Sequence, residues 1–172
     1  MIIVDGKNID LRYVEVSDAE FIYNLRMDKK LNKFLSKTSG TIEDQEKWIN
    51  NYKKREKSLE EYYFIIQNKD SEPIGVVRVY NIEEKTLEWG SWILDYNKAN
   101  PILVVQSILL VYKFIFEMLK YKKLHLEVRK ENKEVVFFHK SYGAYITSED
   151  DENIYFAFDN YEKIKKKYAR YI

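Results

Sequence analysis

The sequence has no cysteine among its 172 residues. This absence excludes disulfides, thiolate zinc sites and any acyl-cysteine intermediate, and nothing points to an oxidising compartment. Only five glycines and two prolines interrupt the chain, and no repeat, low-complexity tract or linker divides it. We therefore expect a single domain over residues 1–172, long enough to bury a core without covalent cross-links.

An excess of charge of one sign is also missing, since 29 Lys plus Arg stand against 28 Asp plus Glu. A formal charge of +1 gives the whole molecule no attraction to nucleic acid or to an anionic membrane. Residues 1–8 are too short and too soon charged for a signal peptide, and the apolar run at 102–111 is too short for a membrane span. We expect a cytoplasmic protein with no nucleic-acid or membrane partner.

The most informative segment present is a strand–helix–strand–helix succession. Residues 86–94 are aromatic and β-rich, whereas residues 101–121 carry apolar side chains at three-and-four spacing. The alternation at 124–128 predicts a half-buried strand, and a helix is expected from 133 to 142, before a glycine. A crossover helix makes the two strands parallel, and ligands of such units usually bind beyond the carboxyl ends of the strands.

The remaining segments predict further elements around this unit. Strands are expected at residues 11–16, 62–67, 74–81, 145–148 and 153–158. Capping boxes beginning at Ser17 and Thr41 predict helices to about Met27 and to Arg55 or beyond. The basic tail at 161–170 is expected to be a solvated helix face. The fold class is therefore α/β, with a central mixed sheet of about six or seven strands and helices on both faces.

This order of elements, from about residue 11 to residue 158, resembles the GNAT superfamily of acetyl-CoA-dependent N-acetyltransferases. The resemblance is to the branch with ribosomal-protein N-terminal acetyltransferases and amino-sugar acetyltransferases. Asn132 and Gly143 match the family's pattern of an asparagine, an apolar helix face and a glycine at the next strand, whereas His139 and Ala144 depart from it. Glu88 lies on the strand where relatives often carry the carboxylate that assists amine deprotonation.

The phosphate loop departs further from the family. Relatives have Gln or Arg, two residues, Gly, one residue, then Gly or Ala, where this chain has Ala-Asn-Pro-Ile-Leu-Val at 99–104. The resemblance implies that the amides of Ile102, Leu103 and Val104 meet the CoA pyrophosphate at a helix N-terminus. Lys98 would supply the charge that the loop otherwise lacks.

The resemblance also implies roles in acyl transfer. Glu88 would take the proton of the substrate ammonium, and burial near Trp89 or Trp92 would raise its pKa from about 4.3. His139 stands where many relatives place the tyrosine that protonates the CoA thiolate. Asn132 would use its side-chain amide on pantetheine. The expected cofactor-binding residues are Trp92, Ile93, Leu94, Ile102, Leu103, Val104 and Asn132.

Each candidate has a simpler structural explanation. Glu88 could be a solvated strand residue opposite the core face, and Asn132 an ordinary helix N-cap. His139 could be a helix-surface histidine that packs between Phe138 and the last strands. His125 shares no short spacing with His139, so we expect no metal site.

The leading hypothesis is direct acetyl transfer from acetyl-CoA to a primary amine of a nucleotide-linked amino sugar or similar small molecule. Arg26, Lys33 and Lys37 could meet the phosphates of such an acceptor. One alternative is a peptide or ribosomal-protein N-terminal acetyltransferase, which the N-terminal half resembles. Another is a GNAT-fold binding module without turnover. Exposed strand edges would also allow two copies of the chain to form a homodimer.

Overall fold

The computed structural model describes residues 1–28, 30–31 and 40–171. The strands are β1 (Ile2–Val4), β2 (Ile9–Tyr13), β3 (Tyr62–Asn68), β4 (Pro73–Tyr80), β5 (Glu88–Leu94), β6 (Leu124–Arg129), β7 (Tyr145–Glu149) and β8 (Asn153–Phe158). The α-helices are α1 (Ala19–Met27), α2 (Ile42–Lys57), α3 (Pro101–Tyr112), α4 (Lys133–Ser141) and α5 (Tyr161–Lys167). All eight strands form one sheet in the order β1-β2-β3-β4-β5-β6-β8-β7.

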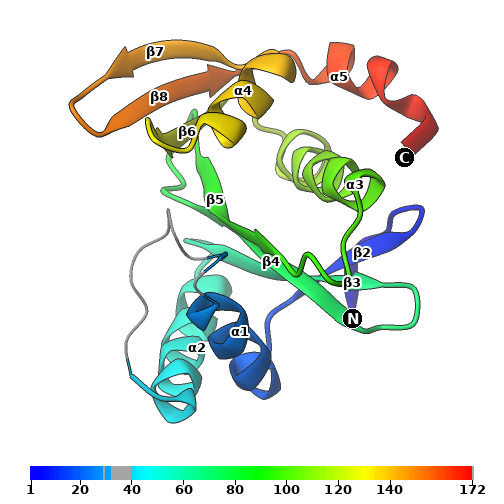
Figure 1. The fold of residues 1–172 in the computed structure, drawn as a ribbon, viewed down its shortest axis with the longest axis vertical. Helices are drawn as coiled ribbons and strands as arrows, with labels where there is room; N and C mark the ends of the chain where they lie inside the picture. The colour runs from blue at the N-terminus through cyan, green and yellow to red at the C-terminus, as the bar shows by residue number, and fades with distance from the viewer. Residues whose placement is uncertain (29, 32–39, 172) are drawn as a thin grey trace.

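The sheet is mixed and has helices on both faces (Figure 1). The helices α1 and α2 cover one face, and α3, α4 and α5 lie on the other. The predicted α/β class is confirmed, but the expected six or seven strands were too few. The additional strand is β1, whose three residues are too short to show a periodic pattern.

Local capping explains where the first helices begin. Thr41 caps α2 as predicted, since its Oγ1 accepts the Asp44 amide at 3.3 Å and Asp44 accepts the Thr41 amide at 3.0 Å. The capping box predicted at Ser17 was wrong. A 3₁₀ turn precedes α1, and buried Asp18 accepts the Glu15 amide at 2.8 Å and two nitrogens of Arg12 at 2.7 and 2.8 Å. The charge-assisted bidentate pair outcompetes a serine hydroxyl.

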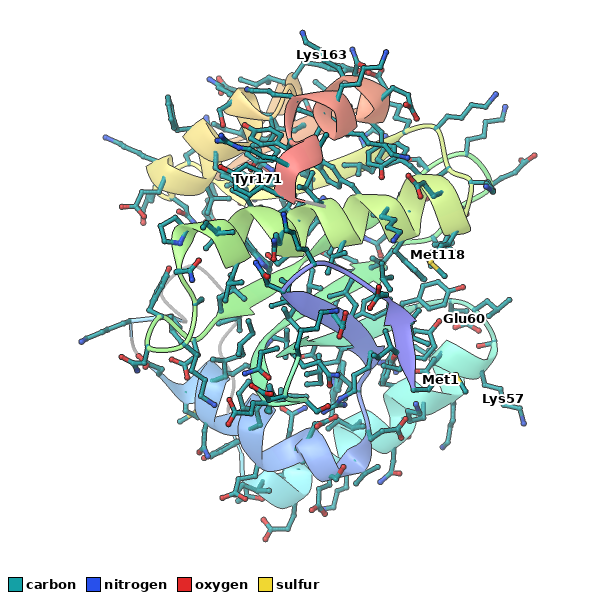
Figure 2. All side chains as sticks on the ribbon, turned by 90° about the vertical axis from the view of Figure 1, so that its right-hand side faces the viewer. Met1, Lys57, Glu60, Met118, Lys163 and Tyr171 are labelled. Atoms are coloured by element: carbon teal, nitrogen blue, oxygen red, sulfur yellow. The ribbon has the colours of Figure 1, made fainter. Side chains whose placement is uncertain are left out.

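The long apolar helix lies across the sheet and supports the core. It begins with Pro101 in α3, continues through a π-helical stretch at Lys113–Met118, and therefore ends before the predicted residue 121. Figure 2 shows it between the sheet and the C-terminal helix. By length and composition Pro101–Met118 could cross a membrane, but half of it is buried inside the protein, as in a core helix.

The parallel strands β5 and β6 meet only at their beginnings. Glu88 pairs with His125, and the His125 amide donates to the Leu87 carbonyl at 2.8 Å. Both strands lie wholly within the described residues, and no second register pair joins them. Instead β6 pairs along its length with β8. The predicted parallel unit is confirmed, and its two strands separate towards their carboxyl ends.

A β-bulge lies in β5 where the strands separate. Val77 of β4 faces two residues of β5, Ser91 and Trp92, and Ser91 has a φ of +48°. A non-glycine residue in this region is strained, and bulges of this kind often redirect side chains beside functional sites. The bulge turns the second half of β5 relative to the first.

Candidate active site

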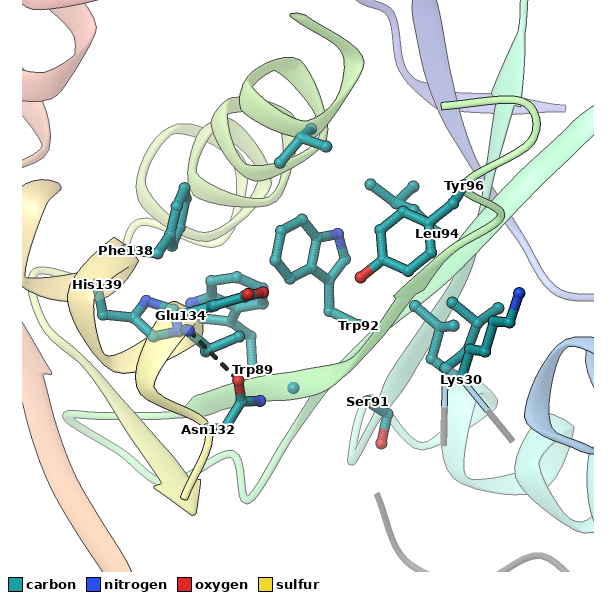
Figure 3. A pocket seen from close by; sticks show the side chains of 15 residues that line it. Lys30, Trp89, Ser91, Trp92, Leu94, Tyr96, Asn132, Glu134, Phe138 and His139 are labelled. Carbon is teal, nitrogen blue, oxygen red and sulfur yellow. Dashed lines mark hydrogen bonds between the residues drawn. The ribbon is translucent and has the colours of Figure 1, made fainter. Parts of the chain in front are cut away.

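A pocket of about 400 Å³ opens beside β5, between α3 and α4 (Figure 3). His139, Phe138 and Trp89 lie at one end in this view, and Tyr96, Leu94 and Lys30 at the other. The pocket brings together six of the predicted site residues, namely Trp92, Ile93, Leu94, Val104, Asn132 and His139. Glu88, Ile102 and Leu103 do not belong to its lining.

Several residues that line the pocket were not predicted from the sequence. These are Lys30, Leu31, Trp89, Gly90, Ser91, Tyr96, Glu134, Val135 and Phe138. Trp89 could have been found from strand alternation, because it precedes the predicted residues on the same short strand. The contribution of Phe138 follows from its place beside His139 on α4, whereas the residues near Lys30 had no sequence signal.

His139 is buried at the inner end of the pocket, with 4% of its surface exposed. Its ring packs edge-on against Trp89 at a centroid distance of 5.6 Å and lies 6.1 Å from the ring of Phe156 on β8. It therefore packs towards a last strand, as the simpler explanation expected, but it is not at the helix surface. Burial lowers the pKa of His139 to about 4, so the imidazole is neutral at pH 7.

Glu88 lies outside this lining, at the point where β5 and β6 separate. It is flanked in register by Tyr80 on β4 and His125 on β6. Burial raises the pKa of the half-buried Glu88 carboxyl, and the neighbouring carboxylate of Glu127 raises it further, while a hydrogen bond from Asn81 acts in the opposite direction. The result is a carboxylate that binds protons more readily than an ordinary glutamate.

Glu88 and Trp89 point to opposite faces of the sheet, because successive strand residues alternate. Trp89 belongs to the core beneath α3. Glu88 shares its face with Tyr80, whose hydroxyl lies so close to Gly90 that a Cβ built there would be 2.6 Å from it. Burial, reinforced by Glu88, raises the pKa of Tyr80 to about 12, so a neutral hydroxyl covers the strand next to Glu88.

Asn132 caps α4 and also lines the pocket. Its Oδ1 accepts the Val135 amide at 3.4 Å, as the dashed line in Figure 3 shows. The side-chain amide nitrogen has no hydrogen bond with the rest of the described chain. The simple capping role is therefore present, and the nitrogen remains available for a ligand in the pocket.

The first amides of α3 are already bonded within the chain. The Ile102 and Leu103 amides donate to Asn100 Oδ1 at 2.9 and 3.1 Å, and the Val104 amide donates to the Asn100 carbonyl at 3.1 Å. A phosphate would have to displace the Asn100 side chain to reach the first two amides. Lys98, expected to supply charge, donates to the Pro73 carbonyl at 3.3 Å. Phosphate binding here stays a prediction.

Two further expectations concern charged residues. Burial raises the pKa of the Tyr63 hydroxyl. The positive charge of Arg26, on α1, lowers that pKa by a smaller amount. Lys33 and Lys37 lie outside the described residues. Within residues 1–28, 30–31 and 40–171, no three metal-ligating side chains lie together.

The parallel strands β5 and β6 separate beside the pocket, and the Glu88 carboxylate lies at the fork where they part. This arrangement is suited to acyl transfer. Residues 8–144 match the model of the acetyltransferase (GNAT) domain. The chain belongs to the GNAT family of acetyltransferases, and membership of this family implies the use of acetyl-CoA.

Solved structures show the same fold. Apo FdhC, described as a nucleotide-linked sugar GNAT, is 46% identical, with a TM-score of 0.90 over 98% of this chain and 97% of that one. The ribosomal-protein-S5-alanine acetyltransferase from Vibrio fischeri is 17% identical, with a TM-score of 0.77 over 91% and 95% of the two chains. Spermidine N-acetyltransferase from Vibrio cholerae, in complex with CoA and spermine, is 18% identical, with a TM-score of 0.77 over 88% and 95%. Among curated proteins none matches the chain.

Proposed function

We propose that this GNAT enzyme transfers an acetyl group from acetyl-CoA directly to a primary amine of a nucleotide-linked amino sugar. The observation that carries the acceptor class is the 46% identity to FdhC over nearly the whole of both chains. The ribosomal-protein and spermidine enzymes are below 20% identity, so their likeness supports the fold and not the acceptor. The same end-to-end match supports a single domain over residues 1–172.

The residues around the pocket fit the donor substrate at its acyl end. The cavity is lined by aromatic and aliphatic side chains together with a few polar and charged ones, and Asn132, with an available amide nitrogen, is part of the lining. Asn132 and Trp92 would hold the pantetheine arm, and Leu94 would present its backbone amide to it. The Ile93 amide faces β4 instead, because Ile93 pairs in register with Val76 and the Asp95 amide, two residues on, donates to the Ile74 carbonyl at 2.9 Å. Acetyl-CoA supplies the activated acetyl thioester. At its phosphate end, the fit requires the Asn100 side chain to turn away from the helix.

Glu88 acts as the general base in the proposed reaction. An amine attacks only in its neutral form, so a proton must leave the ammonium. The raised pKa of Glu88 strengthens it as a proton acceptor, and its position at the fork places it beside the opening between β5 and β6. The hydrogen bond from Asn81 positions the carboxylate, and Tyr80 and His125 lie in register on either side of it.

The free edge of β5 supplies polar groups for the thioester. Beyond Glu88, this edge of the strand has no partner in β6, and the bulge at Ser91 turns the strand. Backbone amides held rigidly in a sheet stabilise developing negative charge without reorganising during the reaction. The Leu94 amide, which points to this free edge, would serve the carbonyl oxygen in this way.

The experiment is a kinetic comparison of acceptors with purified protein. CoA release from acetyl-CoA is measured with nucleotide-linked amino sugars, the same sugars without the nucleotide, spermidine, and a peptide with a free N-terminal alanine. We expect kcat/KM for one nucleotide-linked sugar to exceed every other class by at least about 100-fold, the scale of losing several polar contacts. A preference for the peptide or the polyamine, or no turnover with any amine, would overturn the proposal.

A further inference from the structure

We propose that Trp89, Tyr112, His139 and Tyr142 together bind internal water, and that this water returns a proton to His139 during turnover. The inference rests on the proposed function for its catalytic part only. The four residues come from three elements, namely β5, α3 and the end of α4. They meet directly behind the inner end of the pocket, where Trp89 and His139 form part of its lining.

Four buried polar atoms lie in this cluster without a well-formed hydrogen bond to the rest of the described chain, although the Trp89 N–H approaches the Tyr112 hydroxyl and the Tyr142 hydroxyl approaches that of Tyr168. The four atoms are Trp89 Nε1, Tyr112 Oη, His139 Nδ1 and Tyr142 Oη, and each belongs to a residue no more than 4% exposed. Buried polar groups are nearly always hydrogen-bonded to protein or to ordered water. Half of the eight unpartnered buried atoms in the described chain therefore belong to this one cluster.

The four side chains are close neighbours. The Trp89 ring lies 6.0 Å from that of Tyr112 and 5.6 Å from that of His139, both edge-on. His139 and Tyr142 are three residues apart on one helical turn, so they share a side of α4. Tyr142 and Trp89 also act on the Tyr112 hydroxyl. Burial raises its pKa most, the Tyr142 hydroxyl raises it further, and the Trp89 N–H lowers it as a hydrogen-bond donor.

The chemistry of the cluster suits water in particular. The indole offers only a donor, the two hydroxyls donate and accept, and a neutral imidazole nitrogen does one or the other. Internal waters typically make two to four such bonds to groups that the protein leaves unsatisfied. The four residues carry no formal charge at neutral pH, since burial lowers the pKa of His139 and raises that of both tyrosines. The cluster therefore offers no charge that would balance a bound ion.

The water gives neutral His139 a way to act as an acid. As one ring nitrogen releases its proton to the sulfur of CoA, Nδ1 takes a proton from the internal water, and the imidazole stays neutral. The Tyr142 hydroxyl restores the proton of the water and regains its own from solvent through the hydroxyl of half-buried Tyr168, whose ring stacks on that of Tyr142 at 4.9 Å. The nitrogen loses two protons in a turnover, one from the ammonium and one as the amide forms, and Glu88 passes each to solvent. Sulfur gains one proton, so each turnover releases one proton net.

The binding part is tested without any substrate. In Tyr112→Phe, only a hydroxyl is lost. A hydroxyl without partners would leave Tm unchanged or raised, whereas one bonded to water should lower Tm by about 2 to 4 °C on removal. The matched control is Tyr145→Phe, which removes an exposed hydroxyl bonded to Asp159 at 3.0 Å and should leave Tm nearly unchanged. A Tm for Tyr112→Phe at or above that of the wild type overturns the proposal.

Water itself is detected by NMR. The indole N–H of Trp89, assigned by substituting Trp48 and Trp92 in turn, should show a cross-relaxation peak to a long-lived water, and the peak should weaken in Tyr112→Phe. Its absence in the wild-type protein overturns the proposal. This measurement also separates a water site from direct bonds among the four side chains.

The catalytic part is tested with Tyr142→Phe. We expect kcat to fall about 10-fold or more while KM for acetyl-CoA stays unchanged, because general acid catalysis of this type contributes roughly 10²-fold or more. An unchanged kcat overturns the proton return. Failure of the proposed function would appear differently, as no amine turnover by the wild-type protein, and would leave the Tm and NMR results standing.

Discussion

Burial moves the two candidate catalytic side chains in opposite directions. It makes Glu88 hold a proton more readily and makes His139 hold one less readily. At neutral pH the pair is therefore a strengthened base and a neutral imidazole. The first state suits a reaction that takes a proton from an amine, whereas the neutral imidazole can deliver a proton to sulfur only if another group returns one to it.

The first prediction concerns Glu88. Glu88→Gln should lower kcat by about 10²- to 10³-fold, because the general base is lost. Its raised pKa means that ionised Glu88 is less stable in the folded chain than in the unfolded chain, so the free energy of unfolding at pH 7 should be unchanged or higher. Steady-state kinetics and urea denaturation check both. Glu127→Gln, on the neighbouring strand, is the matched control and should retain most of the kcat.

The second prediction concerns the pH dependence of stability. Folding lowers the pKa of His139 from 6.5 to about 4, so the unfolded chain protonates first as the pH falls. The contribution of His139 is present above pH 6.5 and is lost between 6.5 and about 4, by about 3 kcal/mol in all. In His139→Gln, the free energy of unfolding should fall less steeply over this range. His125→Gln should retain the steep decline, and an equally steep decline in His139→Gln would contradict the prediction.

At the scale of elements, residue patterns predicted most of the fold. Long periodic segments gave α2, α3 and α4, and alternation gave β6, because a face buried along many residues leaves a repeated signal. The strand β1 was missed. The capping box before α1 was assigned to Ser17 instead of Glu15 and Asp18, because the contact of Asp18 with Arg12 of β2 could not be predicted from local sequence. The pocket could be predicted only in part. The burial of His139 depends on Trp89 and Phe156, which are distant in sequence.

The N-terminus of α3 provides the third prediction. Asn100→Ala should reduce the free energy of unfolding by about 1 kcal/mol, as expected for loss of an N-cap. Because the Ile102 and Leu103 amides become available, KM for acetyl-CoA should stay the same or fall. Thr41→Ala removes the cap of α2, far from the pocket, and should cause a similar loss of stability with no change in KM. A marked rise in KM for Asn100→Ala would show instead that Asn100 itself holds the donor.

The bulged strand β5 provides the fourth prediction. A methyl group at Gly90 would meet the Tyr80 hydroxyl at 2.6 Å, so Gly90→Ala should displace Tyr80 and lower kcat about 10-fold by disturbing Glu88. In the Tyr80→Phe background the hydroxyl is gone, so adding Gly90→Ala should lower kcat by clearly less than it does in the wild-type protein. Strictly additive losses in the double variant would contradict this coupling.

At the scale of the whole molecule, donor binding should stabilise the fold. At about 100 times its Kd, acetyl-CoA should raise the free energy of unfolding by about 2.7 kcal/mol, which corresponds to several degrees in Tm. Thermal unfolding with and without millimolar acetyl-CoA checks this, and adenosine alone is the control. No shift with acetyl-CoA would favour a binding module over an enzyme.

The alternation between Glu88 and Trp89 divides the molecule into two compartments. The base lies on the side of α1 and α2, and His139 lies on the side of α3 and α4, with one strand as the partition. In the proposed reaction, the acceptor would approach from the side of α1 and α2 and the donor from the side of α3 and α4. The two substrates would meet only where β5 and β6 separate. Either product could then leave while the other stays bound, so the order of product release should depend on the concentrations of the two products. An inhibitor that joins both substrates would have to pass between β5 and β6.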